Sequence, residues 1–189
     1  MWEIWPENAA PGHWLNVLLF SFSCWLIYRF VYKWIPGHKG VALIAASLFA
    51  VHPIHTEVVA NIKSLDEILG FLLGLCSLHL FMLYLYEGKI LQIGGAMISL
   101  FLALCSKESS ITFVALFPLF AWFVTEKTNK AWIRTSALML VPVVVFLLIR
   151  YNILYSNPLF KPGAPSVADN MLMSAKDPLT RLTGAIAML

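Results

Sequence analysis

The chain has 189 residues, of which 60% are hydrophobic and only 12% are charged. A soluble globular domain has about 45–50% apolar and about 25% charged residues, so this composition excludes that class. Thirteen Lys and Arg and ten Asp and Glu give a net charge of +3, scattered through apolar sequence. Nucleic-acid binding is not expected, because it needs concentrated basic surface.

Apolar stretches along the chain predict membrane helices, since about 20 apolar residues are needed to cross the hydrocarbon core. We expect an all-α polytopic membrane protein with about six transmembrane or re-entrant helices. They are predicted at residues 14–34, 41–60, 68–86, 90–105, 111–125 and 131–155. The pair 90–105 and 111–125 is short, so it either crosses twice or dips in and returns. Residues 182–189 resemble a truncated seventh helix, and residues 1–189 are therefore expected to be a partial membrane domain, a fragment at both ends.

Two sequence features refine these helices. The second is interrupted by His52 and Pro53, and Pro142 is expected to kink the sixth because proline lacks a backbone N–H. Tryptophans near helix ends, Trp34 among them, are expected to be interface anchors.

The basic residues of the short loops predict the orientation, because Lys and Arg are retained on the cytoplasmic side. The loops assigned to that side carry Arg29, Lys33, Lys39, Lys89, Lys127, Lys130 and Arg134. Residues 156–180, which include four prolines, then form an extracytoplasmic loop.

With this orientation, polar residues gather at the outer ends of three hairpins. They are His52, His55, Glu57, Asn61, Lys63, Asp66, Glu67, Lys107, Glu108, Arg150 and Asn152. Charged groups at the membrane interface are costly unless they pair or face a cavity, so they indicate a functional site. Helical spacing places Glu57, Asn61 and Ser64 on one face if the segment after Pro53 is helical, and Lys63 could pair with Asp66 or Glu67.

Each of these residues also has a structural interpretation. His52 before a proline suits a helix cap, Glu57 and Asp66 suit solvated carboxylates, and Lys107 and Arg150 suit snorkelling cations. His79, in the middle of a span, is more typical of a packed or interhelically hydrogen-bonded side chain than of a proton relay.

The functional interpretation is transfer from a lipid-linked phosphate. A carboxylate can act as general base toward a hydroxyl, while Lys and Arg stabilise a leaving phosphate. No Gly-rich phosphate loop, HExxH helix or GxSxG elbow is present. Cys24, Cys76 and Cys105 are widely spaced within apolar runs, so no metal site and no cofactor are expected.

Four motifs resemble a known family. They are LFAVHPIHTEVVANIKSLDEIL at 48–69, SKESSIT at 106–112, GHWLNVLL at 12–19 and LIRYNIL at 148–154. In combination they resemble GT-C type membrane glycosyltransferases, specifically the membrane half of the transmembrane and tetratricopeptide-repeat-containing O-mannosyltransferases and their bacterial relatives.

The resemblance implies a glycosyltransferase that moves a sugar from a polyprenyl-phosphate donor to a protein or glycan acceptor outside the cytoplasm, as in protein O-glycosylation. On the matched motifs we expect the catalytic residues to be Glu57, Asp66, His52 and His55. We expect the substrate-binding residues to be Lys107, Glu108, Arg150 and Glu67. The residues of these motifs resemble the bacterial relatives more closely, which implies a bacterial inner membrane with the site facing the periplasm.

Two departures from the family pattern matter. The usual catalytic acid of the first outer loop has no match, since only Glu3 and Glu7 are present there, and the C-terminal helical repeats are absent. This chain by itself is therefore expected to lack activity. The alternative is a non-catalytic membrane scaffold that binds a partner or a lipid headgroup. A transporter is a weaker alternative, because only His79 and Pro142 lie near mid-membrane.

Overall fold

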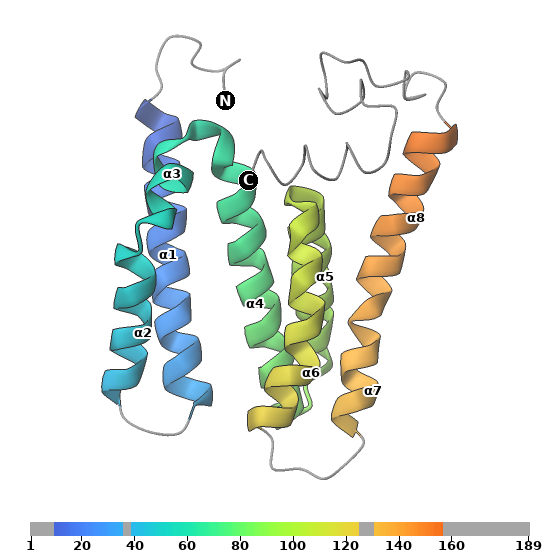
Figure 1. The fold of residues 1–189 in the computed structure, drawn as a ribbon. Coiled ribbons are helices and arrows are strands. Elements are labelled where there is room, and N and C mark those ends of the chain that lie inside the picture. Colours follow the sequence, from blue (N-terminus) through green and yellow to red (C-terminus); the bar gives the residue numbers. More distant parts are fainter. Residues whose placement is uncertain (1–9, 36–38, 125–130, 157–189) are drawn as a thin grey trace, which may run out of the picture. The chain divides into compact units, whose positions relative to one another are not determined.

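The computed structural model describes residues 10–35, 39–124 and 131–156, and every regular element in them is helical (Figure 1). The elements are α1 (Ala10–Trp34), α2 (Lys39–Val51), α3 (Ile54–Ala60), η1 (Ile62–Ser64), α4 (Leu65–Glu87), α5 (Ile90–Ser106), η2 (Glu108–Thr112), α6 (Phe113–Val124), α7 (Ala131–Leu138) and α8 (Leu140–Ser156). The all-α prediction is confirmed. The predicted partial helix 182–189 and loop residues 157–180 lie outside the described residues.

The chain divides into two compact units, residues 1–147 and 148–189. The fold and the site below belong to the first unit. Of the second unit, the structure describes only residues 148–156, which are the C-terminal part of α8.

Three helical segments are long and apolar enough to cross a membrane: Ala10–Trp34, Leu65–Glu87 and Trp132–Tyr155. The pair α2 and α3 makes a fourth if the bent pair counts as one span, while α5 and α6 are shorter apolar helices. The described residues thus contain three or four candidate spans, typical of an integral membrane protein. The larger number expected from the sequence stays a prediction.

The bend between α2 and α3 lies at His52 and Pro53, and the two helix axes differ by 64°. Proline provides no N–H to continue the helical hydrogen bonds, so the chain turns here. The N–H of Ile54 donates to Nδ1 of His52 at 3.3 Å, and α3 then starts in a new direction.

A second break separates α7 from α8 at Met139, whose N–H donates to the carbonyl of Ser136 at 3.1 Å. Pro142 has no N–H to donate to the carbonyl of Leu138, four residues earlier. The helix is therefore interrupted ahead of the proline, and Pro142 itself lies in the first turn of α8.

The core of the first unit lies among α1, α4, α5, α6 and the residues around the α7–α8 break. It is built from the buried side chains Phe30, Trp34, Leu78, Phe81, Met82, Ile93, Ala96, Leu100, Leu104, Phe113, Phe117, Ala121, Met139 and Val143. Most other large apolar side chains are exposed on the helix surfaces, as expected for helices that face lipid.

Small residues on α4 allow its neighbours to approach closely. A Cβ atom on Gly74 would lie 2.5–2.7 Å from ring atoms of Phe113 on α6. One turn further along, the hydroxyl of Ser77 donates to the carbonyl of Ala96 on α5 at 2.7 Å. Small residues and interhelical hydrogen bonds of this kind are how membrane helices associate.

Near the middle of α4, the indole N–H of Trp34 donates to Nδ1 of His79 at 3.2 Å, which joins α1 to α4. The prediction that His79 makes an interhelical contact is confirmed. The prediction that Trp34 is an interface anchor is wrong, because its side chain is buried and its N–H is bound within the protein.

Candidate functional site

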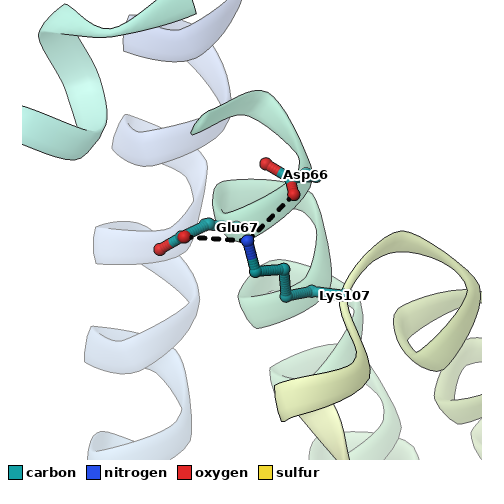
Figure 2. A network of polar contacts seen from close by, with 3 residues as sticks. All are labelled: Asp66, Glu67 and Lys107. Carbon is teal, nitrogen blue, oxygen red and sulfur yellow. Dashed lines mark hydrogen bonds and ion pairs between the residues drawn. The ribbon is translucent and has the colours of Figure 1, made fainter. Parts of the chain in front are cut away.

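Three charged side chains from two distant parts of the chain meet at the start of α4 (Figure 2). Nζ of Lys107 lies 3.0 Å from Oδ2 of Asp66 and 2.9 Å from Oε1 of Glu67. We call Asp66, Glu67 and Lys107 the charged triad. It joins the start of α4 to the turn between α5 and η2, across a separation of 41 residues between Asp66 and Lys107.

Local structure places each member of the charged triad. Asp66 and Glu67 lie in the first turn of α4, where the positive end of the helix dipole favours carboxylates. Lys107 has an extended backbone between α5 and η2. Its N–H donates to the carbonyl of Ala103 at 2.9 Å, and its carbonyl accepts from the N–H of Ser110 at 3.0 Å.

Gly70 brings the Lys107 turn against α4, one turn from the acidic pair. A Cβ atom on Gly70 would lie 2.8 Å from Oγ of Ser110 and 3.0 Å from Cβ of Lys107. A side chain at this position would require the Ser110 hydroxyl or the Lys107 turn to move. The close approach at Gly70 therefore sets the position along α4 at which Lys107 contacts Asp66 and Glu67.

The charged triad is partly open to solvent, with side chains 36% (Lys107), 42% (Asp66) and 48% (Glu67) exposed. Hydrogen bonds from its ammonium to Glu67 and then to Asp66 raise the pKa of Lys107 above its ordinary value. Lys107 is therefore cationic at neutral pH, and one cation with two carboxylates has a formal charge of −1. Half-exposed ion pairs contribute little to stability. The charged triad is therefore a candidate for a chemical role rather than a stabilising one.

The predicted histidines lie on either side of the α2–α3 bend. The ring of His55 packs against Phe49 and Phe20, with centroid distances of 4.2 and 5.4 Å. His52 is exposed, and its ring centroid lies 5.8 Å from that of His55. Glu57, on α3, is also exposed.

The structure contradicts two expectations, one about a shared helix face and one about the ion pair of Lys63. Glu57, Asn61 and Ser64 do not share one helix face, because α3 ends at Ala60 and Asn61 has an extended backbone. The Oδ1 atom of Asn61 accepts from the N–H of Lys63 at 3.0 Å, so Asn61 begins a new short helix instead. Lys63 is exposed, and the partner of both α4 carboxylates is Lys107 rather than Lys63.

Two predicted site residues, Glu108 and Arg150, do not belong to the charged triad. Glu108 is exposed at the start of η2, next to Lys107. Arg150 lies on α8 in the second unit, so its place at a donor phosphate stays a prediction.

One buried polar residue, Asn16, is not indicated by any of the sequence patterns. It is 1% exposed on α1, and its amide Nδ2 donates to the carbonyls of Asn61 at 3.0 Å and Val59 at 3.4 Å. The available signal was an amide within an apolar span, in the motif GHWLNVLL. That motif contributed to the family resemblance, but the buried amide itself received no role.

No metal ligand set is found in the part of the chain that the structure describes. Residues 10–35, 39–124 and 131–156 contain no group of three or more His, Cys, Asp or Glu side chains that could hold an ion. The charged triad itself presents two carboxylates and one ammonium group.

These features define a class: an all-helical integral membrane protein with paired acidic and basic side chains where helix ends meet. Among curated proteins, the chain is 36% identical over 105 residues to the protein O-mannosyl-transferase Tmtc1 of Drosophila melanogaster, covering 53% of this chain and 12% of that protein. It is 32% identical to the human protein O-mannosyl-transferase TMTC1, over 56% of this chain and 13% of that protein. It is 33% identical to mouse TMTC1, over 56% and 12% respectively.

These similarities confirm the resemblance to the TMTC O-mannosyltransferases. The chain spans only 12–13% of the length of the curated relatives it matches. No protein-family model matches the chain. No solved structure matches it either.

Proposed function

We propose that the protein is part of a GT-C type membrane glycosyltransferase, with six or seven spans, that moves a sugar from a polyprenyl-phosphate donor to a hydroxyl of a protein acceptor. The names of the similar proteins support sugar transfer to protein. The charged triad supports the chemistry, because it holds a cation and two carboxylates together at the end of a membrane helix.

In the proposed reaction, the acceptor oxygen attacks the anomeric carbon of the donor sugar. A carboxylate, Asp66 or Glu57, takes the hydroxyl proton as the new carbon–oxygen bond forms. The bond between the anomeric carbon and the phosphate oxygen breaks, and its electron pair leaves with the polyprenyl phosphate. Cations stabilise the negative charge that develops on this leaving group.

Lys107 is the proposed cation for the donor phosphate, with Arg150 as a second. The partly exposed Lys107 ammonium can donate a hydrogen bond to a phosphate oxygen while Glu67 keeps it in place. Binding of the phosphate would also weaken the ion pair between Lys107 and Asp66, and the carboxylate of Asp66 could then act as a base.

The other predicted residues have supporting roles in this proposal. His52 and His55 shape the acceptor side of the site at the α2–α3 bend, while Glu67 and Glu108 contact the sugar hydroxyls. In this proposal the site faces the periplasm of a bacterial inner membrane. The basic residues of the predicted cytoplasmic loops support this orientation.

The observation that carries the proposal is the pairing of Lys107 with both Asp66 and Glu67. The test is transfer of labelled sugar from polyprenyl-phosphate mannose to an acceptor polypeptide by the full-length protein in membranes. Lys107→Met is expected to lose transfer by about 100-fold, typical of removing one group that stabilises developing charge. The matched control is Lys89→Met, because Lys89 also forms an ion pair with a glutamate, Glu87, at 2.7 Å.

Transfer by the wild-type and Lys89→Met proteins, with loss in Lys107→Met, supports the proposal. A wild-type protein that binds the donor but transfers nothing would contradict it and favour the scaffold alternative. Equal rates in the two lysine variants would contradict the assignment of Lys107.

A further inference from the structure

We infer that Asn16 is a positioning residue that holds the acidic pair of the charged triad against Lys107, by fixing the junction between α3 and η1. The inference rests on the proposed function for its catalytic consequence. Its structural basis is the pair of hydrogen bonds from α1 to this junction.

The junction is a place where backbone carbonyls need partners. Val59 belongs to the last turn of α3, whose carbonyls have no N–H donor within the helix. Asn61 lies between the two helices, and its carbonyl already accepts from the N–H of Ser64 at 3.0 Å. Nδ2 of Asn16 donates to both carbonyls, at 3.4 and 3.0 Å, from a helix 43 to 45 residues away in the sequence.

The orientation of the Asn16 amide follows from these partners. Carbonyl oxygens only accept hydrogen bonds, so the amide nitrogen must face the junction. Oδ1 is then buried and has no hydrogen-bond partner among the described residues. An unpaired buried oxygen is unfavourable, so the chain keeps Asn16 in this orientation at a cost. This supports a role for the two donated bonds.

The junction is directly connected to the charged triad. Oδ1 of Asn61 caps η1 by accepting from the N–H of Lys63, and η1 leads at Ser64 into α4. Asp66 and Glu67 follow within the first turn. Because only the short η1 separates the held carbonyl from the acidic pair, a displaced junction also displaces the carboxylates that contact Lys107.

The test compares two substitutions of Asn16 with a matched control on α1. Asn16→Leu keeps the side-chain size and the apolar character of the helix but has no donor. Asn16→Asp keeps the shape and replaces the donor with an oxygen. The control is Ser23→Ala, because Ser23 is also fully buried on α1 and its hydroxyl donates only within the helix, to the carbonyl of Leu19 at 2.9 Å.

Two readouts are measured on the full-length protein. The first is the rate at which an amine-acylating reagent labels Lys107, determined by mass spectrometry relative to Lys89. We expect both Asn16 variants to increase the relative rate by about two- to fivefold, the range set by loss of a half-exposed ion pair. The second is transfer kinetics, in which kcat is expected to fall by about tenfold while KM for the donor is unchanged.

Faster labelling with a lower kcat in both Asn16 variants, and neither change in Ser23→Ala, supports the inference. Labelling of Lys107 at the wild-type rate in Asn16→Leu overturns it, as does faster labelling with an unchanged kcat. A wild-type protein without transfer activity would overturn the proposed function alone, and the labelling rates would still decide whether Asn16 places the charged triad.

Discussion

Gly70 on α4 and Lys107 in the α5–η2 turn approach so closely that their Cβ atoms would lie 3.0 Å apart if Gly70 were alanine. This contact, rather than any local sequence spacing, aligns Lys107 with Asp66 and Glu67. The position of the charged triad therefore depends on a residue that has no side chain.

The first prediction concerns Gly70→Ala. The added methyl group would press on Oγ of Ser110 and on Cβ of Lys107, so the Ser110 hydroxyl must rotate away and Lys107 must shift by a few tenths of an ångström. Sugar transfer is expected to fall by about 10- to 100-fold, because small misplacements of reacting groups reduce rates strongly. Gly94→Ala is the control, because a Cβ atom there meets nothing within 4 Å. Equal transfer rates in the two variants would show that the approach of Gly70 is unimportant.

The second prediction concerns stability. Gly74→Ala places a methyl group 2.5–2.7 Å from the ring of Phe113, which is buried in the core. Such overpacking is expected to reduce the free energy of unfolding by about 1–3 kcal/mol. Unfolding in mixed micelles measures the change, with Gly94→Ala again as the reference. Retention of wild-type stability in Gly74→Ala would contradict the close packing of α4 against α6.

The third prediction concerns the hydrogen bond between Trp34 and His79. Trp34→Phe removes the N–H donor while keeping an aromatic ring beside Tyr86. A double-mutant cycle with His79→Leu is expected to give a coupling of about 0.6 kcal/mol in the free energy of unfolding, a typical value for interhelical bonds in membranes. Strictly additive effects would mean that the two side chains do not interact.

The fourth prediction concerns pH. Because Glu67 and Asp66 raise the pKa of Lys107, the ion pairs are fully formed below the ordinary lysine pKa of about 10.4 and are lost as the pH rises through the raised value. The pH at which acylation of Lys107 becomes fast is therefore expected to be lower in Glu67→Gln than in the wild type. The same midpoint in both proteins would show that Glu67 does not hold the ammonium.

The sequence predicted much of this architecture from local signals. Apolar length predicted an all-helical chain, and proline chemistry predicted an interruption at Pro53. The motifs also singled out Asp66, Glu67 and Lys107, which the structure places in contact.

What could not be predicted depends on contacts between distant segments. Lys63 was an equally reasonable partner for Asp66 on sequence spacing, and only the approach of the α5–η2 turn at Gly70 selects Lys107. Likewise, an apolar span with one amide gives no indication that Asn16 reaches the carbonyl of Asn61, 45 residues later. Trp34 followed the pattern of an interface anchor, but packing against His79 determined its environment.

In the proposed sugar transfer, Lys107 and Glu67 are expected to act as one unit. The most direct measurement is a double-mutant cycle in kcat/KM of the full-length protein, with Lys107→Met, Glu67→Gln and the double variant. Groups that act as a unit are strongly non-additive, so we expect each single variant to lose about 100-fold and the double variant to lose no more. Losses that multiply in the double variant, or single variants with wild-type rates, would contradict the account.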